Sequence, residues 1–347
     1  MRKSFRIAAT AIALFTAGTA RVSAQKASEW FLPDISSSTY IIEDYRTDTG
    51  KFSTHPLSAI TASFGRGTSF EFTASYDIIK SKFMGLEGYL KIHPALNIRA
   101  GIQRMPFLHE TTYSPRILEA VGFSQGASLL GGYSGDITGI NSRSRDCGIL
   151  LEGVLFSDGE RAVLRYWAGV FNGNGYSFSD NNRAKDFQGK ILFAPWKTLS
   201  FTLGVMKAKY SPVGEDGKYD RDILLRRDRI TAGIWGDWGR WYLRGENIFG
   251  WTGDKRNECA FLMGGYRPTE NTAIGARMDY SNVDIGSSVP MDILKPQICF
   301  THFLKGNALS YRLQYGRTIF SDPDREDYGT ISFCAIFRFG LSLRKDT

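Results

Sequence analysis

Apolar and polar residues alternate along most of this chain in stretches of about ten residues. Between Leu86 and His93, one parity carries apolar residues and glycine, and the other carries polar residues: Leu86, Gly88, Leu90 and Ile92 against Glu87, Tyr89, Lys91 and His93. Successive side chains of a β-strand point to opposite faces. Each such stretch therefore predicts a strand with one apolar face and one polar face.

Runs of this kind, bounded by turn residues, predict fifteen strands. They lie at 57–65, 68–78, 82–93, 96–104, 145–156, 161–171, 184–194, 198–210, 226–238, 240–251, 257–267, 271–281, 292–304, 308–319 and 328–339. A bacterial single-chain barrel normally closes with an even number of strands. A weaker run, Ser38 to Arg46, supplies a sixteenth, placed first in the chain.

The connections between these runs alternate in length. The short ones are 66–67, 94–95, 157–160, 195–197, 238–240, 267–270 and 305–307, and the longer ones are 47–56, 105–144, 172–183, 211–225, 282–291 and 320–327. Only the short links near 79–80 and 252–256 depart from this order. Short periplasmic turns and longer external loops are typical of outer-membrane barrels. We therefore expect an all-β fold, a transmembrane antiparallel β-barrel of about 16 strands, with both chain ends in the periplasm.

The N-terminus has the three parts of a cleavable signal peptide. A basic start, Arg2 to Arg6, precedes an apolar stretch from Ile7 to about Ala20 and the small residues Val22-Ser23-Ala24. Cleavage after Ala24 would leave 25–347 as a single outer-membrane barrel. Elsewhere no window of about 18 residues is free of charge, so no transmembrane helix is expected.

The composition fits a barrel and argues against other classes. The 37 Gly, 24 Phe, 16 Tyr and 7 Trp favour strands, tight turns and aromatic girdles. Removing the four basic residues of the signal peptide leaves 39 basic against 35 acidic residues, a net charge of +4 that is too small to indicate nucleic acid as a partner. The four cysteines are widely spaced and are interpreted as small apolar side chains within strands: Cys147, Cys259, Cys299 and Cys334.

Several short motifs between residues 85 and 200 resemble the phosphate-selective porin O and P family. They are Arg99-Ala-Gly-Ile-Gln-Arg-Met-Pro-Phe107, Ser114-Pro-Arg-Ile-Leu-Glu119, Arg145-Asp-Cys-Gly148, Ala168-Gly-Val-Phe-Asn-Gly-Asn-Gly175 and Lys185-Asp-Phe-Gln-Gly-Lys190. The resemblance implies an outer-membrane channel, trimeric in its relatives, whose lumen carries basic residues. It also implies that Arg104 takes the place of the family's basic residue before Pro-Phe, and that Arg116 and Arg145 match the family's arginines in the constriction loop and at the next strand start.

The connection 105–144 is the third external loop and is about forty residues long. Loops of that length are usually functional or disordered. In general porins the third loop folds into the lumen and narrows it, so we expect this loop to form the constriction. The alternative is an exposed, mobile surface loop.

A barrel of about sixteen strands is too wide for side chains to fill and leaves an aqueous channel. Arginine on the lipid face costs about 2–4 kcal/mol at the midplane, so strand arginines should point inward. The strand residues assigned inward are eight basic and four acidic: Lys91, Arg99, Arg165, Lys190, Arg244, Arg277, Arg312 and Arg338 against Glu87, Glu152, Glu246 and Asp279. The candidate pore-lining and constriction residues are Arg99, Arg104, Arg116, Arg143, Arg145, Arg165, Lys190, Arg244, Arg277 and Arg312.

These residues predict a porin that passes small hydrophilic solutes with a mild preference for anions, phosphate among them. The alternative for the lining is a solvated wall without selectivity. The expected partners are outer-membrane lipid and small anionic or hydrophilic solutes.

No motif for catalysis is present: the sequence lacks Gly-x-Ser-x-Gly, His-Glu-x-x-His, Gly-x-Gly-x-x-Gly and Cys-x-x-Cys. We therefore expect no enzyme, cofactor or metal site. Two other functions stay open, namely a structural or adhesive barrel with a plugged lumen and, ranked below it, a lipid-modifying barrel enzyme. His109, in the expected constriction, could titrate near neutral pH and modulate conductance.

Overall fold

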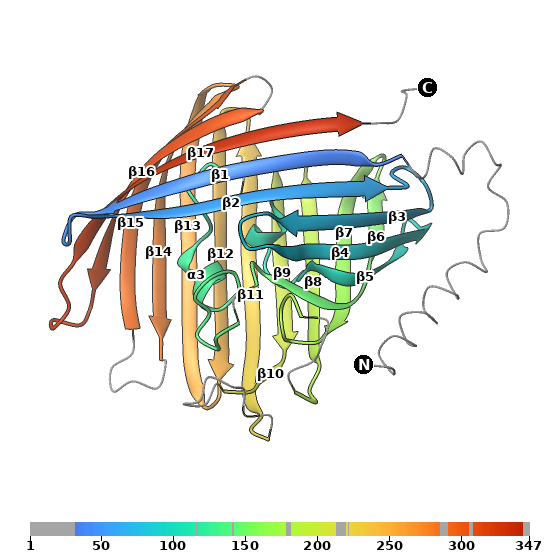
Figure 1. Ribbon diagram of the computed structural model, residues 1–347, viewed down its shortest axis with the longest axis horizontal. Coiled ribbons are helices and arrows are strands. Elements are labelled where there is room, and N and C mark those ends of the chain that lie inside the picture. Colours follow the sequence, from blue (N-terminus) through green and yellow to red (C-terminus); the bar gives the residue numbers. More distant parts are fainter. Residues whose placement is uncertain are drawn as a thin grey trace.

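The computed structural model describes residues 32–115, 117–140, 142–177, 182–212, 220, 222–284, 291–304 and 308–342. Sixteen long strands and one two-residue strand form a single antiparallel sheet (Figure 1). Their bounds are β1 Asp34–Arg46, β2 Lys51–Phe64, β3 Phe70–Asp77, β4 Lys82–His93, β5 Leu96–Arg104, β6 Arg145–Asp158, β7 Arg161–Phe171, β8 Asp186–Trp196, β9 Leu199–Lys207, β10 Lys209–Tyr210, β11 Leu225–Trp238, β12 Trp241–Thr252, β13 Lys255–Thr269, β14 Thr272–Val283, β15 Met291–Leu304, β16 Leu309–Phe320 and β17 Tyr328–Ser342.

The sheet closes on itself through its first and last strands. β1 pairs with β17 from Asp34 opposite Ser342 to Arg46 opposite Thr330, and it also pairs with β2. Every long strand therefore has a neighbour on both sides, so the barrel has no open edge at which another chain could pair. The expected 16-stranded antiparallel barrel is confirmed, including Ser38 to Arg46 as part of its first strand. No helix among the described residues is long and apolar enough to cross a membrane.

One predicted connection is wrong. The segment 47–56 was expected to be a long loop, but β2 already begins at Lys51 and the turn is only 47–50. Residues 51–56 are exposed on both faces and contain Pro56, so they have no apolar side that could show as an alternation. Pairing with β1 orders them instead, and Tyr45 and Phe52 lie across the turn with ring centroids 4.9 Å apart.

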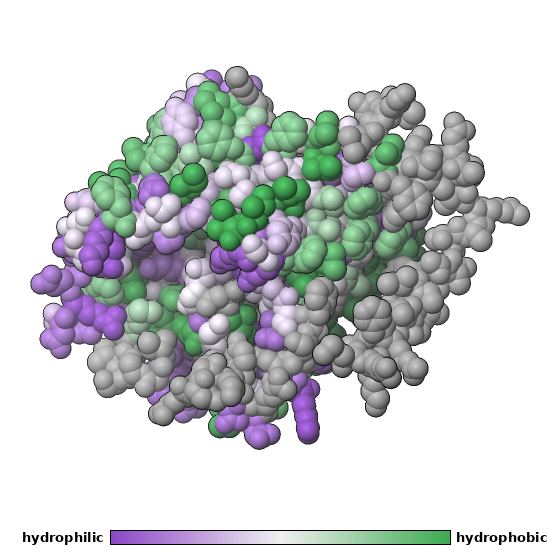
Figure 2. Space-filling model, in the orientation of Figure 1, coloured by the Kyte–Doolittle hydropathy of each residue, from purple (hydrophilic) through white to green (hydrophobic). Residues whose placement is uncertain are grey.

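The two faces of the strands follow the predicted parity. In β16 the side chains of Ser310, Arg312 and Gln314 are at most 6% exposed, whereas Tyr311, Leu313 and Tyr315 are 36–51% exposed. Figure 2 shows apolar residues over β17, β1 and β2 and hydrophilic residues gathered where the 47–50 and 321–327 connections lie. The outward face is thus apolar along the strand bodies and polar at the end that carries the longer connections.

The described residues of the segment 105–144 between β5 and β6, called the lumen loop below, lie inside the ring of strands (Figure 1). It contains a short 3₁₀ turn, η1 (Glu110–Thr112), and one short helix, α3 (Gln125–Leu129). Its buried residues pack against inward-facing side chains of β9 and β12–β14. The expectation that this loop folds into the lumen is therefore confirmed.

Candidate functional site

The lumen loop is organised around Ser124, which caps α3. Its Oγ accepts a hydrogen bond from the backbone N–H of Ala127 at 3.1 Å and donates one to Glu110 Oε2 at 2.6 Å. A serine at this position satisfies an amide that the helix leaves unpaired. Because Glu110 belongs to η1, the same side chain also fixes the two turns relative to each other.

Apolar contacts seat the loop on one side of the barrel. Loop and wall residues form one buried cluster: Phe107, Leu108, Leu118, Phe123, Ala127 and Leu130 from the loop, and Met206, Ala208, Ile248, Cys259 and Val283 from the wall. These wall residues would contact water if the loop were absent, so their burial favours the docked loop by about 25 cal/mol per Å² of apolar surface.

Glu246 on β12 accepts hydrogen bonds from the first turn of the loop. Its two carboxylate oxygens lie 2.8 Å from the backbone N of His109 and 3.0 Å from that of Glu110, and Thr231 donates a third bond at 2.9 Å. All four residues are at most 4% exposed. A buried carboxylate needs such donors, and buried amides need an acceptor. Glu246 is therefore a specific anchor for the loop.

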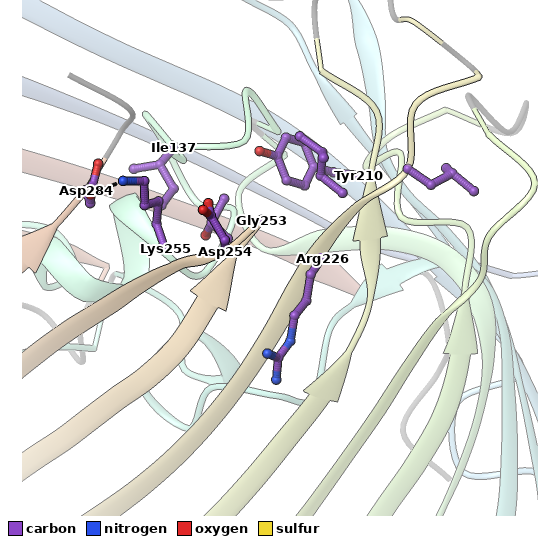
Figure 3. Close-up of a pocket in the computed structure, with 10 residues that line it drawn as sticks. Ile137, Tyr210, Arg226, Gly253, Asp254, Lys255 and Asp284 are labelled. Carbon is purple, nitrogen blue, oxygen red and sulfur yellow. Dashed lines mark ion pairs between the residues drawn. The ribbon is translucent and has the colours of Figure 1, made fainter. Parts of the chain in front are cut away.

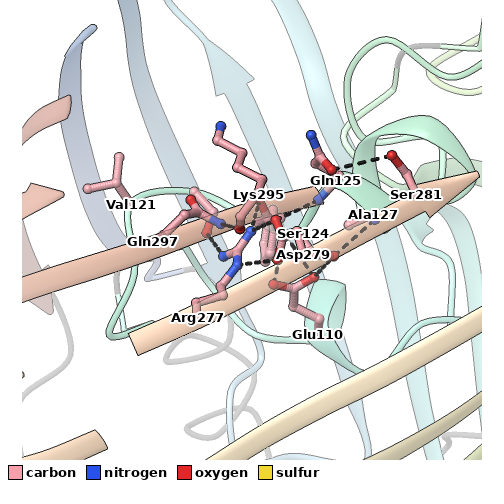
Figure 4. Close-up of polar contacts among 12 residues, drawn as sticks. Glu110, Val121, Ser124, Gln125, Ala127, Arg277, Asp279, Ser281, Lys295 and Gln297 are labelled. Atoms are coloured by element: carbon pink, nitrogen blue, oxygen red, sulfur yellow. Dashed lines mark hydrogen bonds and ion pairs between the residues drawn. The ribbon is translucent and has the colours of Figure 1, made fainter. Parts of the chain in front are cut away.

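Further along the loop, wall arginines bind its carboxylates and carbonyl groups. Arg244 and Arg267 lie 3.0 and 2.7 Å from Glu119 Oε1, and Arg277 donates to the carbonyl of Phe123 at 2.9 Å while pairing with Asp279 at 2.6 Å. Figure 4 shows Arg277 among Asp279, Glu110 and Ser124. These bonds fasten the middle of the loop to β12–β14.

The loop covers the inner wall on one side of the barrel, and the inner wall on the other side remains accessible to water. The inward-facing residues of β14 and β16 are all buried, from Ala273 to Val283 and from Ser310 to Thr318. The inward-facing residues of β3–β5 are mostly half-buried, and Arg165 on β7 is exposed. Water therefore reaches the inner face mainly along β3–β5 and beside Arg165 on β7, since Asp146, Leu150 and Glu152 of the intervening β6 are buried.

The structure divides the ten candidate residues into three groups, apart from Arg116, which lies outside the described residues. Four bind the loop itself: Arg104, Arg244, Arg277 and Arg312. Two form ion pairs on the wall: Arg99 with Glu87 and Glu152 at 3.4 and 3.0 Å, and Arg143 with Asp77 at 3.1 Å. The other three, Arg145, Arg165 and Lys190, make no ion pair with any described residue.

Arg104 of β5 and Arg145 of β6 lie opposite each other, but their side chains make different contacts. Arg104 Nη1 donates to the carbonyls of Thr111 and Tyr113, both at 2.5 Å, and so holds η1 in place. The Nη1 atom of Arg145 lies 2.8 Å from the point where a Cβ on Gly85 would stand. Gly85 therefore leaves the space in which this guanidinium lies against β4.

Two cations share one indole on the wet side. The Cζ atom of Arg165 lies 5.0 Å and the Nζ atom of Lys190 4.6 Å from the ring centroid of Trp167, whose Nε1 donates to Glu152 at 3.0 Å. Arg165 is exposed, whereas Lys190 is 3% exposed. By contrast, Lys91 is paired with Glu71 at 2.5 Å. A count of inward charges alone therefore overstates the free positive charge of the lining, whereas Arg165 is exposed and has no carboxylate within 4 Å among the described residues.

One aromatic cluster could not be predicted from the sequence, because its members come from the loop and from different strands. His109 lies edge-on to Tyr113 and Trp235 with centroids 5.1 and 4.7 Å away, and Trp235 meets Phe261 at 5.9 Å. Burial lowers the pKa of His109 well below its usual value. The expectation that His109 titrates near neutral pH is therefore wrong, because its ring is packed away from water.

A cavity of about 520 Å³ opens at the long-connection end of the barrel (Figure 3). Ile137 of the lumen loop, Tyr210 and the ion pair between Lys255 and Asp284, 3.3 Å apart, line it. Within the described residues no group of three or more His, Cys, Asp or Glu side chains is arranged to hold a metal ion.

Comparison with known proteins identifies the architecture. No protein-family model and no curated protein matches the sequence. Among solved structures, OmpF of Salmonella typhi, in complex with daunomycin, matches with a TM-score of 0.65 at 13% identity over 88% of this chain and 97% of that chain. The fold is that of the porins. The anion-selective porin from Comamonas acidovorans matches with a TM-score of 0.62 at 10% identity, covering 88% and 98%. The trimer form of in-vitro folded OmpT of Vibrio cholerae gives 0.59 at 11%, covering 88% and 99%.

Proposed function

We propose that the chain forms an outer-membrane channel for the passive diffusion of small hydrophilic solutes, with a mild preference for anions such as phosphate. The observation that carries this proposal is the wet, charged half of the inner wall. Lys91, Arg99 and Glu87 keep 38%, 28% and 21% of their side-chain surface on the inward face, and Arg165 is exposed there. Charged side chains that keep this much exposed surface inside a closed barrel face water, because an unpaired charge in a dry interior would be costly.

The anion preference rests on the cations that lack a carboxylate partner within the described residues. Arg165 and Lys190 lie beside one indole, and Arg145 lies on the same side of the lumen against β4. Rings of Arg or Lys are the usual means by which a pore favours anions. The motif resemblance to the phosphate-selective porin O and P family, and the description of one structural neighbour as anion-selective, support the same proposal.

Location and assembly belong to the proposal as well. Exposed apolar side chains cover the outward faces of the strands, and tryptophans stand near their ends: Trp196, Trp238 and Trp241 at the short-turn end and Trp251 at the other. This arrangement suits a bilayer with aromatic girdles at both interfaces. A cleaved signal peptide over 1–24 would deliver the chain to the periplasm. The trimer form of a structural neighbour favours a homotrimer.

Planar-bilayer recording of the refolded protein tests the channel. We expect stepwise ion currents and, in a potassium chloride gradient, a reversal potential displaced toward chloride. Phosphate added to one side should reduce the chloride current if it enters the same pore. Absence of any current from correctly folded barrels would overturn the proposal and favour the structural or adhesive barrel, whose lumen the loop would plug.

A further inference from the structure

A row of charged and aromatic side chains crosses the outer surface of the barrel at its long-connection end. Lys207 at the end of β9 forms an ion pair with Asp228 of β11, and register places Asp228 opposite Trp251 of β12 and Trp251 opposite Arg256 of β13. Lys209 of β10 stands opposite Arg226 of β11. We call the four cations, Lys207, Lys209, Arg226 and Arg256, the basic rim.

The basic rim faces outward, directly beyond the apolar band. Side chains of the same parity on the same strands are exposed and apolar: Leu203 and Val205 on β9, Ile230 on β11 and Leu262 on β13, each 44–56% exposed. Lys207 and Arg226 keep 74% and 46% of their side-chain surface. Figure 3 shows the guanidinium of Arg226 turned away from the Lys255–Asp284 pair at the external cavity.

Two tryptophans on one strand place the basic rim at a membrane boundary. Trp241 and Trp251 share the outward parity of β12 and lie ten residues apart. At about 3.3 Å per residue and a tilt of about 40°, ten residues span about 25 Å of membrane thickness, the height of the apolar band of outer-membrane barrels. Trp251 therefore stands where hydrocarbon gives way to headgroups, and the basic rim stands beside it.

Aromatic rings hold two of these cations at that level. The guanidinium carbon of Arg226 lies 4.4 Å from the ring centroid of Trp251, and that of Arg256 lies 4.4 Å from the ring of Phe249. Long cationic side chains at an interface lay their stems on apolar surface and keep the charged head in the polar layer. Cation–π contact with the rings restricts where these heads can lie.

The basic rim carries more positive charge than its neighbours neutralise. Lys207 Nζ and Arg226 Nε both lie 2.6 Å from the same atom, Asp228 Oδ2, so one carboxylate serves two cations. Arg256 and Lys209 form no ion pair within the described residues. The nearby Glu258 accepts a hydrogen bond from Asn247 at 3.0 Å. Within the described residues, the ion pairs of these four cations thus involve a single carboxylate, that of Asp228.

Three other cations at this end of the barrel each lie beside a carboxylate of their own. Arg46 lies 2.5 Å from Asp48, Arg317 lies 3.3 Å from Asp327, and Arg325 lies 3.6 Å from Asp322. At these three positions one carboxylate serves one cation, whereas in the basic rim Asp228 serves two.

We propose that the basic rim binds the phosphate of an anionic lipid headgroup in the external leaflet. The inference rests on the proposed function, because it requires that the barrel sit in the outer membrane with its longer connections outside. Guanidinium groups match phosphate oxygens bidentately, and two of the four cations are arginines already positioned by aromatic rings. The lipid phosphate would neutralise the positive charge of the basic rim that Asp228 does not neutralise.

Native mass spectrometry of the refolded barrel in neutral detergent tests this inference. The lipid A used as probe is a diphosphorylated glycolipid, and phosphatidylcholine is its neutral comparison. The rim variant is K207Q/R226Q/R256Q, and the matched control, K51Q/R317Q/R325Q, removes three cations from the same end of the barrel outside β9–β13. We expect the rim variant to bind lipid A at least about tenfold more weakly, and the control to bind it like the original chain.

A charge-preserving variant, K207R/R226K/R256K, keeps the test valid if the rim variant refolds poorly, and it should retain most of the binding. Equal binding by the rim variant and the original chain would overturn the inference, as would an equal loss in the control. Equal affinity for lipid A and phosphatidylcholine would also overturn it, and so would complete displacement of lipid A by millimolar inorganic phosphate.

Bilayer recording in neutral lipid separates this inference from the proposed function. Both variants should conduct like the original chain, because none of the substituted residues lies on β3–β7, where water reaches the inner face. If no protein conducts but the difference in lipid A binding persists, the proposed function fails and the lipid site stands. If all conduct and the difference is absent, the lipid site alone fails.

Discussion

At the scale of single residues, Arg165 is the side chain on which the anion preference should depend most. It is exposed on the inward face and has no carboxylate within 4 Å among the described residues. At about 8 Å in water one unit charge contributes about 0.5 kcal/mol, so Arg165→Glu changes the local energy of a permeating anion by about 1 kcal/mol before screening. We expect the chloride-to-potassium permeability ratio to fall about two- to threefold, measured as a reversal potential. Arg325→Glu, in an external connection, should leave it unchanged, and an unaltered ratio in Arg165→Glu would show that solutes pass elsewhere.

Glu110 predicts a dependence of loop docking on pH. Burial raises its pKa from about 4.5 to about 7 in spite of nearby Arg277 and the two hydrogen-bond donors of Ser124. The folded form then binds more protons than the unfolded form between these values, so its contribution falls by roughly 3 kcal/mol as pH rises from about 4.5 to about 7 and is constant above. Glu110→Gln should remove this fall, as measured by thermal unfolding between pH 5 and 8.

His109 acts in the opposite direction, because its lowered pKa favours the folded form as pH rises toward 6.5. Both proteins retain this histidine, so the difference between their unfolding curves isolates Glu110. A difference that stays constant from pH 5 to 8 would contradict the assignment.

The residue scale also shows what the sequence could and could not predict. Strand parity correctly assigned Arg312, Arg277 and Arg244 to the inside, because an arginine on the lipid face is costly. Strand parity could not show that these three arginines bind the loop. Their partners, Pro115, Phe123 and Glu119, lie more than a hundred residues away in the chain. A pairing of that kind is set by the tertiary fold and leaves no local pattern.

At the scale of elements, strands were predictable wherever one face met lipid and the other met water or the loop. The alternation fails at residues 51–56, where both faces are exposed, and β2 was therefore begun too late. The alternation also continues through residue 208, so the sequence predicts one strand where the structure separates β9 from β10. The lumen loop was recognised by its length alone, since its turns η1 and α3 are too short to show periodicity.

Docking of the lumen loop should depend on the anchor Glu246. Glu246→Ala removes the acceptor of two buried backbone amides, those of His109 and Glu110, at a cost of about 1–3 kcal/mol for each unpaired group. We expect the start of the loop to detach intermittently, seen as increased current noise and a higher mean conductance in single-channel recordings. Glu258→Ala, on the outward face of β13, is the matched control. A quiet trace of unchanged amplitude from Glu246→Ala would show that the apolar cluster alone holds the loop.

At the scale of the whole molecule, the barrel is asymmetric inside and should conduct along one side. Most of the loop's bonds are to β11–β16, and Arg143 near its end pairs with Asp77 of β3, so a solute passing through the lumen should travel between the rest of the loop and β3–β7. The loop packs against the opposite wall, which explains why the inward faces of those strands carry both apolar residues and arginines. A sixteen-stranded barrel needs such a partition, because its own side chains cannot fill it.

Two serine-to-cysteine substitutions test this partition directly. Ser63 on β2 and Ser281 on β14 both face inward, but Ser63 is half-buried whereas Ser281 is 0% exposed beneath the loop. In a background with the four native cysteines replaced by serine, a water-soluble methanethiosulfonate should label Ser63→Cys at least about tenfold faster than Ser281→Cys, because a fully covered site reacts only when the structure opens locally. Labelling at position 63 should also reduce the current. Equal rates at the two positions would place water on both sides of the loop, and the conducting path could then no longer be assigned to one wall.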